Sequence, residues 1–118
     1  MRVLVVDDAP YMIKAIRDIL EAYRHEVFEA VNGEEAVLRY AEIRPDVVLM
    51  DILMPTLDGV SATRKIVEQD SDANIIVITA VGKSGLEKDC LDAGAKKFIV
   101  KPFKIKELLS SIEALAGQ

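Results

Sequence analysis

Five polar residues with chemically useful side chains each stand at or just beyond the end of an apolar run. They are three aspartates, a threonine and a lysine: Asp7, Asp8, Asp51, Thr79 and Lys101. Clustered carboxylates repel one another and favour a hard cation, and Mg²⁺ fits because carboxylates, waters and phosphate oxygens usually hold it. A carboxylate can also attack phosphorus, while lysine supplies a positive charge and threonine a hydroxyl donor. These residue types therefore indicate Mg²⁺-dependent phosphoryl chemistry, which needs mainly positioning and charge neutralisation.

The elements that would position these residues are five short apolar runs rich in Val and Ile. The runs are Val3–Val6, Val27–Ala30, Val47–Met50, Ile75–Ile78 and Phe98–Val100. Most lack polar alternation, which is typical of strands buried on both faces of a parallel sheet. The second run is the exception, because Glu26 and Glu29 flank and interrupt it, and it therefore suits an edge strand.

The segments between the runs have the spacing of amphipathic helices. Two apolar stripes stand out, one made of Ile13, Ile16, Ile19 or Leu20, and Tyr23, the other of Ile105, Leu108, Leu109, Ile112 and Leu115. Pro10 suits the first turn of a helix, where its missing N–H is not needed. Asn32 with Glu35 resembles a capping box, and Gly94 would end the fourth helix.

Strand followed by helix, five times over, predicts a doubly wound α/β fold. Such a fold has a parallel five-stranded sheet, right-handed crossovers and helices on both faces. In an open parallel sheet the ligand site lies beyond the carboxyl ends of the strands. The aspartates, the threonine and the lysine come from the ends of four strands, so we expect one polar site at that edge.

Length and composition limit the classes of function that are possible. The chain has 118 residues, which suits a single domain over residues 1–118. Its net charge of −5 disfavours direct binding to nucleic acid, because a negative domain repels phosphate backbones. Cys90 is the only cysteine, so no intramolecular disulfide can form, and we interpret it as a packing residue in a reducing compartment. No apolar run approaches the roughly 18 residues of a membrane span, so a soluble, cytoplasmic protein is expected.

The motifs, in this order, resemble the receiver domains of two-component response regulators. Any one of them is weak alone, but together they cover essentially the whole chain. The matching segments are Val5-Val6-Asp7-Asp8, Met50-Asp51-Ile52-Leu53-Met54-Pro55 with Asp58-Gly59, Ile78-Thr79-Ala80, and Gly94-Ala95 leading to Val100-Lys101-Pro102-Phe103. The segments 79–82 and 93–103 look most like the chemotaxis, CheY-like, single-domain branch. The resemblance implies a flavodoxin-like three-layer sandwich with strand order 2-1-3-4-5.

The resemblance implies that Asp51 accepts a phosphoryl group from a phosphohistidine on a partner histidine kinase. Asp8, Asp51 and the backbone carbonyl of Leu53 would coordinate Mg²⁺, with Asp7 acting largely through water. Such a protein catalyses only its own phosphorylation and dephosphorylation and has no external substrate. Leu53 and Val81, which flank the path of the attacking water in this family, are apolar here, so we expect slow self-dephosphorylation.

The resemblance also implies a switch. Thr79, the backbone N–H of Ala80 and Lys101 would hold the phosphoryl oxygens, and the Lys101–Pro102 peptide would be cis. Phosphorylation would draw Thr79 inward and let Phe98 rotate, reshaping the face of the fourth helix, fifth strand and fifth helix for a protein partner. Many family members carry tyrosine in place of Phe98, so here no hydroxyl can lock either state.

Three interpretations stay open from the sequence. The first is a stand-alone receiver, a monomer or a phosphorylation-dependent dimer, acting by protein binding. The second is the receiver part of a longer DNA-binding transcriptional regulator. The third is an aspartate-nucleophile phosphatase of the haloacid dehalogenase class, although Leu53 stands where that class has a second acid. A purely structural role would make Asp7 and Asp8 caps of the first helix. Asp58 is expected in a turn or at the start of the third helix.

Overall fold

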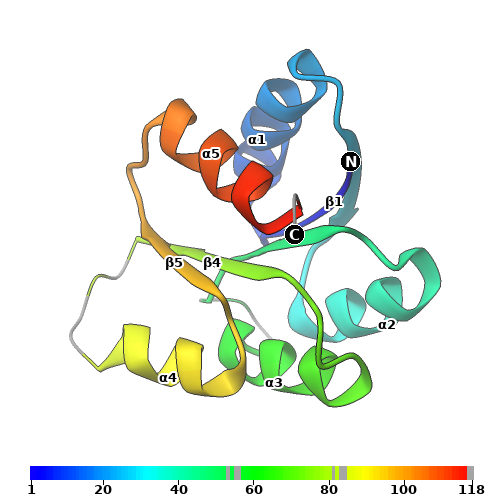
Figure 1. Ribbon diagram of the computed structural model, residues 1–118, viewed down its shortest axis with the longest axis vertical. Helices are drawn as coiled ribbons and strands as arrows, with labels where there is room; N and C mark the ends of the chain where they lie inside the picture. The colour runs from blue at the N-terminus through cyan, green and yellow to red at the C-terminus, as the bar shows by residue number, and fades with distance from the viewer. Residues whose placement is uncertain (53, 55–56, 81, 83–84, 117–118) are drawn as a thin grey trace.

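The computed structural model describes residues 1–52, 54, 57–80, 82 and 85–116, in which strand and helix alternate five times (Figure 1). The strands are β1 (Arg2–Val6), β2 (Glu26–Ala30), β3 (Val47–Met50), β4 (Ile75–Thr79) and β5 (Lys97–Val100). The helices are α1 (Pro10–Ala22), α2 (Gly33–Ile43), α3 (Gly59–Gln69), α4 (Leu86–Ala93) and α5 (Ile105–Ala116). Every predicted strand agrees with the structure to within one residue at each end.

The five strands form one parallel sheet in the order β2-β1-β3-β4-β5, as predicted. The glutamate-containing strand β2 lies at an edge, which confirms its interpretation as an edge strand. Helices α1 and α5 cover one face of the sheet, and α2, α3 and α4 cover the other (Figure 1). Each face has its own core: Leu49 packs with the α1 and α5 side, and its neighbour Met50 with the opposite side. This alternation explains why β3 is apolar at every position.

Side-chain caps and a glycine fix several helix ends. Asn32 accepts a hydrogen bond from the backbone N–H of Glu35 at 2.8 Å, and the Glu35 carboxylate reaches back to the N–H of the residue before Asn32. Asn32 is therefore confirmed as the N-cap, while the return bond from Glu35 goes to the N–H of Val31 and not to that of Asn32, as a capping box would have it. Asp58 accepts from the N–H of Ser61 at 2.9 Å and so begins α3. Gly94 ends α4 in the left-handed region, as predicted.

Two residues of the predicted apolar stripes do not join the core. Tyr23 follows the last residue of α1 and is 59% exposed, and Ile105, the first residue of α5, is 49% exposed. Both lie at helix ends, beyond the turns that pack on the sheet. Cys90 is fully buried in α4, which confirms its packing role. Within the described part of the chain, the helices are too short or too polar to cross a membrane.

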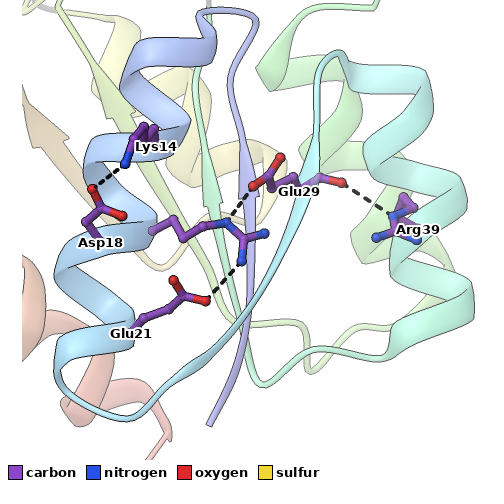
Figure 2. A network of polar contacts seen from close by, with 6 residues as sticks. Lys14, Asp18, Glu21, Glu29 and Arg39 are labelled. Carbon is purple, nitrogen blue, oxygen red and sulfur yellow. Dashed lines mark hydrogen bonds and ion pairs between the residues drawn. The ribbon is translucent and has the colours of Figure 1, made fainter.

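The outer edge of β2 carries a group of charged contacts, the edge network (Figure 2). Arg17 of α1 donates to the carboxylate of Glu29 in β2 at 2.6 Å and to that of Glu21 at 3.1 Å. Arg39 of α2 donates to the backbone carbonyl oxygen of Glu29 at 3.4 Å. The edge network thus joins helices from opposite faces of the sheet across β2. The contact with Arg39 also occupies the carbonyl oxygen of Glu29, which an added strand could otherwise use as a hydrogen-bond acceptor.

Candidate functional site

Three carboxylates meet at the carboxyl edge of the sheet and form the acidic cluster. Asp7 and Asp8 follow β1, Asp51 follows β3, and these two strands are hydrogen-bonded neighbours. One carboxylate oxygen from each aspartate lies within 4.8 Å of the other two. The structure therefore brings the predicted aspartates together. Oxygen donors gathered this closely suit a hard divalent cation.

Asp7 is the most enclosed member of the acidic cluster, with 3% exposure. One of its carboxylate oxygens accepts the backbone N–H of Ala9 at 2.9 Å, and the other accepts the ammonium of Lys101 at 3.2 Å. Both carboxylate oxygens of Asp7 are therefore engaged in hydrogen bonds. The N-cap of α1 is Ala9, without a side-chain cap bond. The structure therefore does not support a purely capping role for the aspartate pair.

Asp51 is the half-buried member, and its surroundings perturb its pKa. Burial is the largest cause and the negative charge of Asp7 adds to it, so that the pKa of Asp51 rises from 3.8 to about 6. The Lys101 ammonium and the backbone N–H of Ile52, which lies 2.9 Å from Asp51 Oδ1, act in the opposite direction. Burial and the neighbouring carboxylates thus together disfavour the charged form of Asp51. A bound cation would oppose this effect.

The remaining predicted residues come to the same edge from β4 and β5. Thr79 is the last residue of β4 and is fully buried, while Ala80 follows it and is exposed. The backbone N–H of Lys101 donates to the carbonyl oxygen of Thr79 at 2.7 Å, which fixes the two strand ends side by side. The Lys101–Pro102 peptide is cis, as the family resemblance implies.

The ion pair between Lys101 and Asp7 is the feature that the sequence did not reveal. The prediction placed the lysine toward phosphoryl oxygens, whereas its ammonium lies 3.2 Å from a carboxylate 94 residues away in the chain. No local motif marks this pairing. The only signal available was the strand order, which puts the ends of β1 and β5 at the same edge of the sheet.

The predicted switch residue, Phe98, lies in β5, half-buried against the core on the side of α3 and α4. Together with Gly82, Leu91 and Val100 it lines a surface groove of about 590 Å³ between α4 and β5. The predicted responding side chain thus lies on the face where the resemblance places partner binding. Leu53, whose carbonyl is a predicted metal ligand, and Val81 lie outside the described residues.

The fold agrees with comparisons to known proteins. Residues 3–113 match the response regulator receiver domain. The chain is 42% identical over 116 residues to the chemotaxis protein CheY of Thermotoga maritima, covering 98% of this chain and 97% of that one. It is 46% identical over 112 residues to CheY of Bacillus subtilis, with 94% and 93% covered. A crystal structure of a CheX-CheY-BeF3-Mg complex from Borrelia burgdorferi matches with a TM-score of 0.92 and 38% identity, over 97% of this chain and 87% of that one. The chain therefore belongs to the receiver domain family of two-component response regulators and is CheY-like.

Proposed function

We propose that the chain, as one receiver domain over residues 1–118, takes up a phosphoryl group on Asp51 from a sensor histidine kinase. The observation that carries this proposal is the acidic cluster, whose carboxylates lie within 4.8 Å of one another beside a lysine side chain that is only 17% exposed. Chemotaxis is the proposed pathway, because the relatives in Thermotoga and Bacillus are chemotaxis proteins.

Mg²⁺ is the proposed cofactor. The donor set consists of carboxylate oxygens, and burial together with the negative charge of Asp7 raises the pKa of Asp51, an effect that a bound cation would oppose. Asp8 and Asp51 would hold the ion directly, together with the backbone carbonyl of Leu53, while Asp7 would act through water. When bound, Mg²⁺ supplies neutralisation of the charge on the transferred phosphoryl oxygens. The complex from Borrelia contains Mg²⁺, which supports this assignment.

In the transfer step, an ionised carboxylate oxygen of Asp51 forms a bond to phosphorus. The bond from phosphorus to the donor imidazole nitrogen breaks, and its electron pair returns to that nitrogen. A pKa of about 6 keeps Asp51 mostly ionised at neutral pH, as a nucleophile must be. The half-buried position also limits the access of competing water.

The phosphoryl oxygens would be held by the hydroxyl of Thr79, the backbone N–H of Ala80 and the ammonium of Lys101. For this, Lys101 turns from Asp7 toward the new anion, which its flexible stem allows. Inward movement of Thr79 would let Phe98 rotate and alter the groove between α4 and β5. A protein partner that reads the face of α4, β5 and α5 would then distinguish the two states. In the Borrelia complex, CheY is bound to CheX.

The chain would catalyse only its own phosphorylation and dephosphorylation. Leu53 and Val81 have no polar group to orient an attacking water. The proposed signal is therefore long-lived relative to that of receivers with polar residues at these two positions.

The test is an intact-mass measurement after incubation with acetyl phosphate and Mg²⁺, beside an Asp51→Asn control. We expect the mass of one phosphoryl group in the wild type and none in the variant or in chelator. Absence of phosphorylation together with absence of Mg²⁺ binding would make the acidic cluster structural and contradict the proposal. Phosphorylation of the Asp51→Asn variant would assign the acceptor to another residue.

A further inference from the structure

Two helix starts approach neighbouring backbone so closely that only glycine fits there. A Cβ atom on Gly33, the first residue of α2, would overlap the backbone carbonyl oxygen of Leu57 and lie 2.8 Å from its carbonyl carbon. A Cβ atom on Gly59, the first residue of α3, would overlap the carbonyl oxygen of Asp51 and lie 2.7 Å from the Cα of Ile52. Both contacts are therefore backbone against backbone.

These contacts join α2 to Asp51 through one short piece of chain. Leu57 and Gly59 are separated only by Asp58, which is held as the N-cap of α3. The backbone N–H of Gly59 also donates to the carbonyl oxygen of Ile52 at 2.9 Å. The start of α2, the segment from Leu57 to Gly59 and the end of β3 thus form a continuous stack. Close-packed interiors transmit displacement because they contain few voids to absorb it.

Neither side of the contact at Gly33 can move away freely. The side chain of Leu57 packs against the core, which holds its segment from the protein side. Ala36 and Tyr40 of α2 are buried in the same core, so the helix cannot retreat without opening it. A Cβ atom at Gly33 must therefore displace the Leu57–Gly59 segment, whose backbone contacts that of Asp51.

We propose that Gly33 is a positioning residue for Asp51. Helix α2 contributes no carboxylate to the acidic cluster. Its first residue nevertheless holds the Leu57–Gly59 segment, which contacts the backbone of Asp51. The inference rests on the proposed function, since it concerns Mg²⁺ binding and phosphoryl transfer at that site. A misplacement of about 1 Å can cost about a hundredfold in rate, so we expect Gly33→Ala to slow phosphorylation at least about tenfold. The Mg²⁺ dissociation constant should rise severalfold.

The matched control is Gly94→Ala. Gly94 directly precedes β5 and so lies near the amino ends of the strands, away from the acidic cluster. A Cβ atom on Gly94 would lie 2.6 Å from Val67 Cγ2, and the residue has a φ of +117°, so this variant is also destabilised. Urea unfolding gives the stability of each variant, calorimetry gives Mg²⁺ affinity, and acetyl phosphate gives the phosphorylation rate at limiting and saturating donor. We expect both variants to lose stability, but only Gly33→Ala to lose affinity and rate.

A second pair keeps the test decisive if Gly33→Ala does not fold. Leu57→Ala removes the side chain that anchors the Leu57–Gly59 segment, without adding bulk. Its control is Val67→Ala, which alters the residue that Gly94 approaches. Lower affinity and rate in Leu57→Ala alone would support the inference. Wild-type values in Leu57→Ala, or equal losses in the Gly94 or Val67 variants, would overturn it. If the wild type itself binds no Mg²⁺ and takes up no phosphoryl group, the proposed function fails and the inference fails with it.

Discussion

Two charged regions of the molecule use similar residue types in different surroundings. In the acidic cluster, Lys101 faces Asp7 at 3.2 Å, and their side chains are 17% and 5% exposed. In the edge network, Arg17 faces Glu29 at 2.6 Å, and their side chains are 30% and 41% exposed. The contact distances do not separate the two regions in a way that reflects their surroundings. The exposure of the paired side chains to water does separate them.

The balance of charge differs as well. In the edge network, the hydrogen bond to Glu29 raises the pKa of Arg17 and stabilises its charge. In the acidic cluster, three carboxylates are gathered near one lysine among the described residues, and burial with Asp7 raises the pKa of Asp51 to about 6. Partly buried charge without full compensation is unfavourable and is typical of sites that a ligand completes. This imbalance is the reason for proposing the acidic cluster, and not the edge network, as the functional site.

The largest expected effect comes from breaking the buried ion pair. Lys101→Met leaves Asp7 with only the N–H of Ala9, and a buried charge that loses its partner is strongly destabilising. We expect the free energy of unfolding to fall by about 3–5 kcal/mol without Mg²⁺. Urea unfolding followed by circular dichroism measures it.

The control for this prediction lies in the edge network. Arg17→Met removes a partner of Glu29 that water can replace, so we expect a loss of no more than about 1 kcal/mol. Similar losses in both variants would show that burial does not separate the two regions.

The next effect is a dependence of stability on pH that comes from Asp51. Because its pKa is raised in the folded state, the fold favours the protonated form. This contribution is fully present below pH 3.8 and is lost as the pH rises through about 6. Asp51→Asn should therefore stabilise the metal-free protein at pH 8 by about 1–2 kcal/mol, after allowance for partial exposure, and by much less at pH 4.

Unfolding of both proteins in chelator across this pH range measures the difference. An Asp51→Asn advantage that is equal at pH 4 and pH 8 would contradict the assigned cause. Addition of Mg²⁺ should stabilise the wild type more than the variant, since the cation neutralises the ionised carboxylate.

Much of the fold could be predicted because parallel strands buried on both faces are continuous apolar runs. The run Val47–Met50 is buried at all its positions, and its limits in the structure are those predicted. The helix stripes were less informative at their ends. Tyr23 and Ile105 keep the helical period but lie beyond the turns that touch the sheet, so period alone cannot report their exposure.

The site could be predicted in part for a related reason. Asp8 and Asp51 follow strands, and the carboxyl ends of parallel strands share one edge, so their meeting could be inferred from topology. The partner of Lys101, which is Asp7, could not be predicted, because the sequence does not say where a flexible lysine side chain points. The close approach of Gly33 to Leu57 was also missed, since it depends on how two loops pack and not on a local pattern.

The smallest expected effect is the coupling between Arg17 and Glu29 in the edge network. A double-mutant cycle with Arg17→Met and Glu29→Gln isolates their interaction from the separate contact of Arg17 with Glu21. The pair is partly exposed, so we expect a coupling of about 0.2–1 kcal/mol that weakens as salt is added. A coupling above about 2 kcal/mol that salt leaves unchanged would be typical of a buried pair. In that case the edge network would hold α1 and β2 together as firmly as Lys101 holds Asp7, and charge imbalance alone would distinguish the two regions.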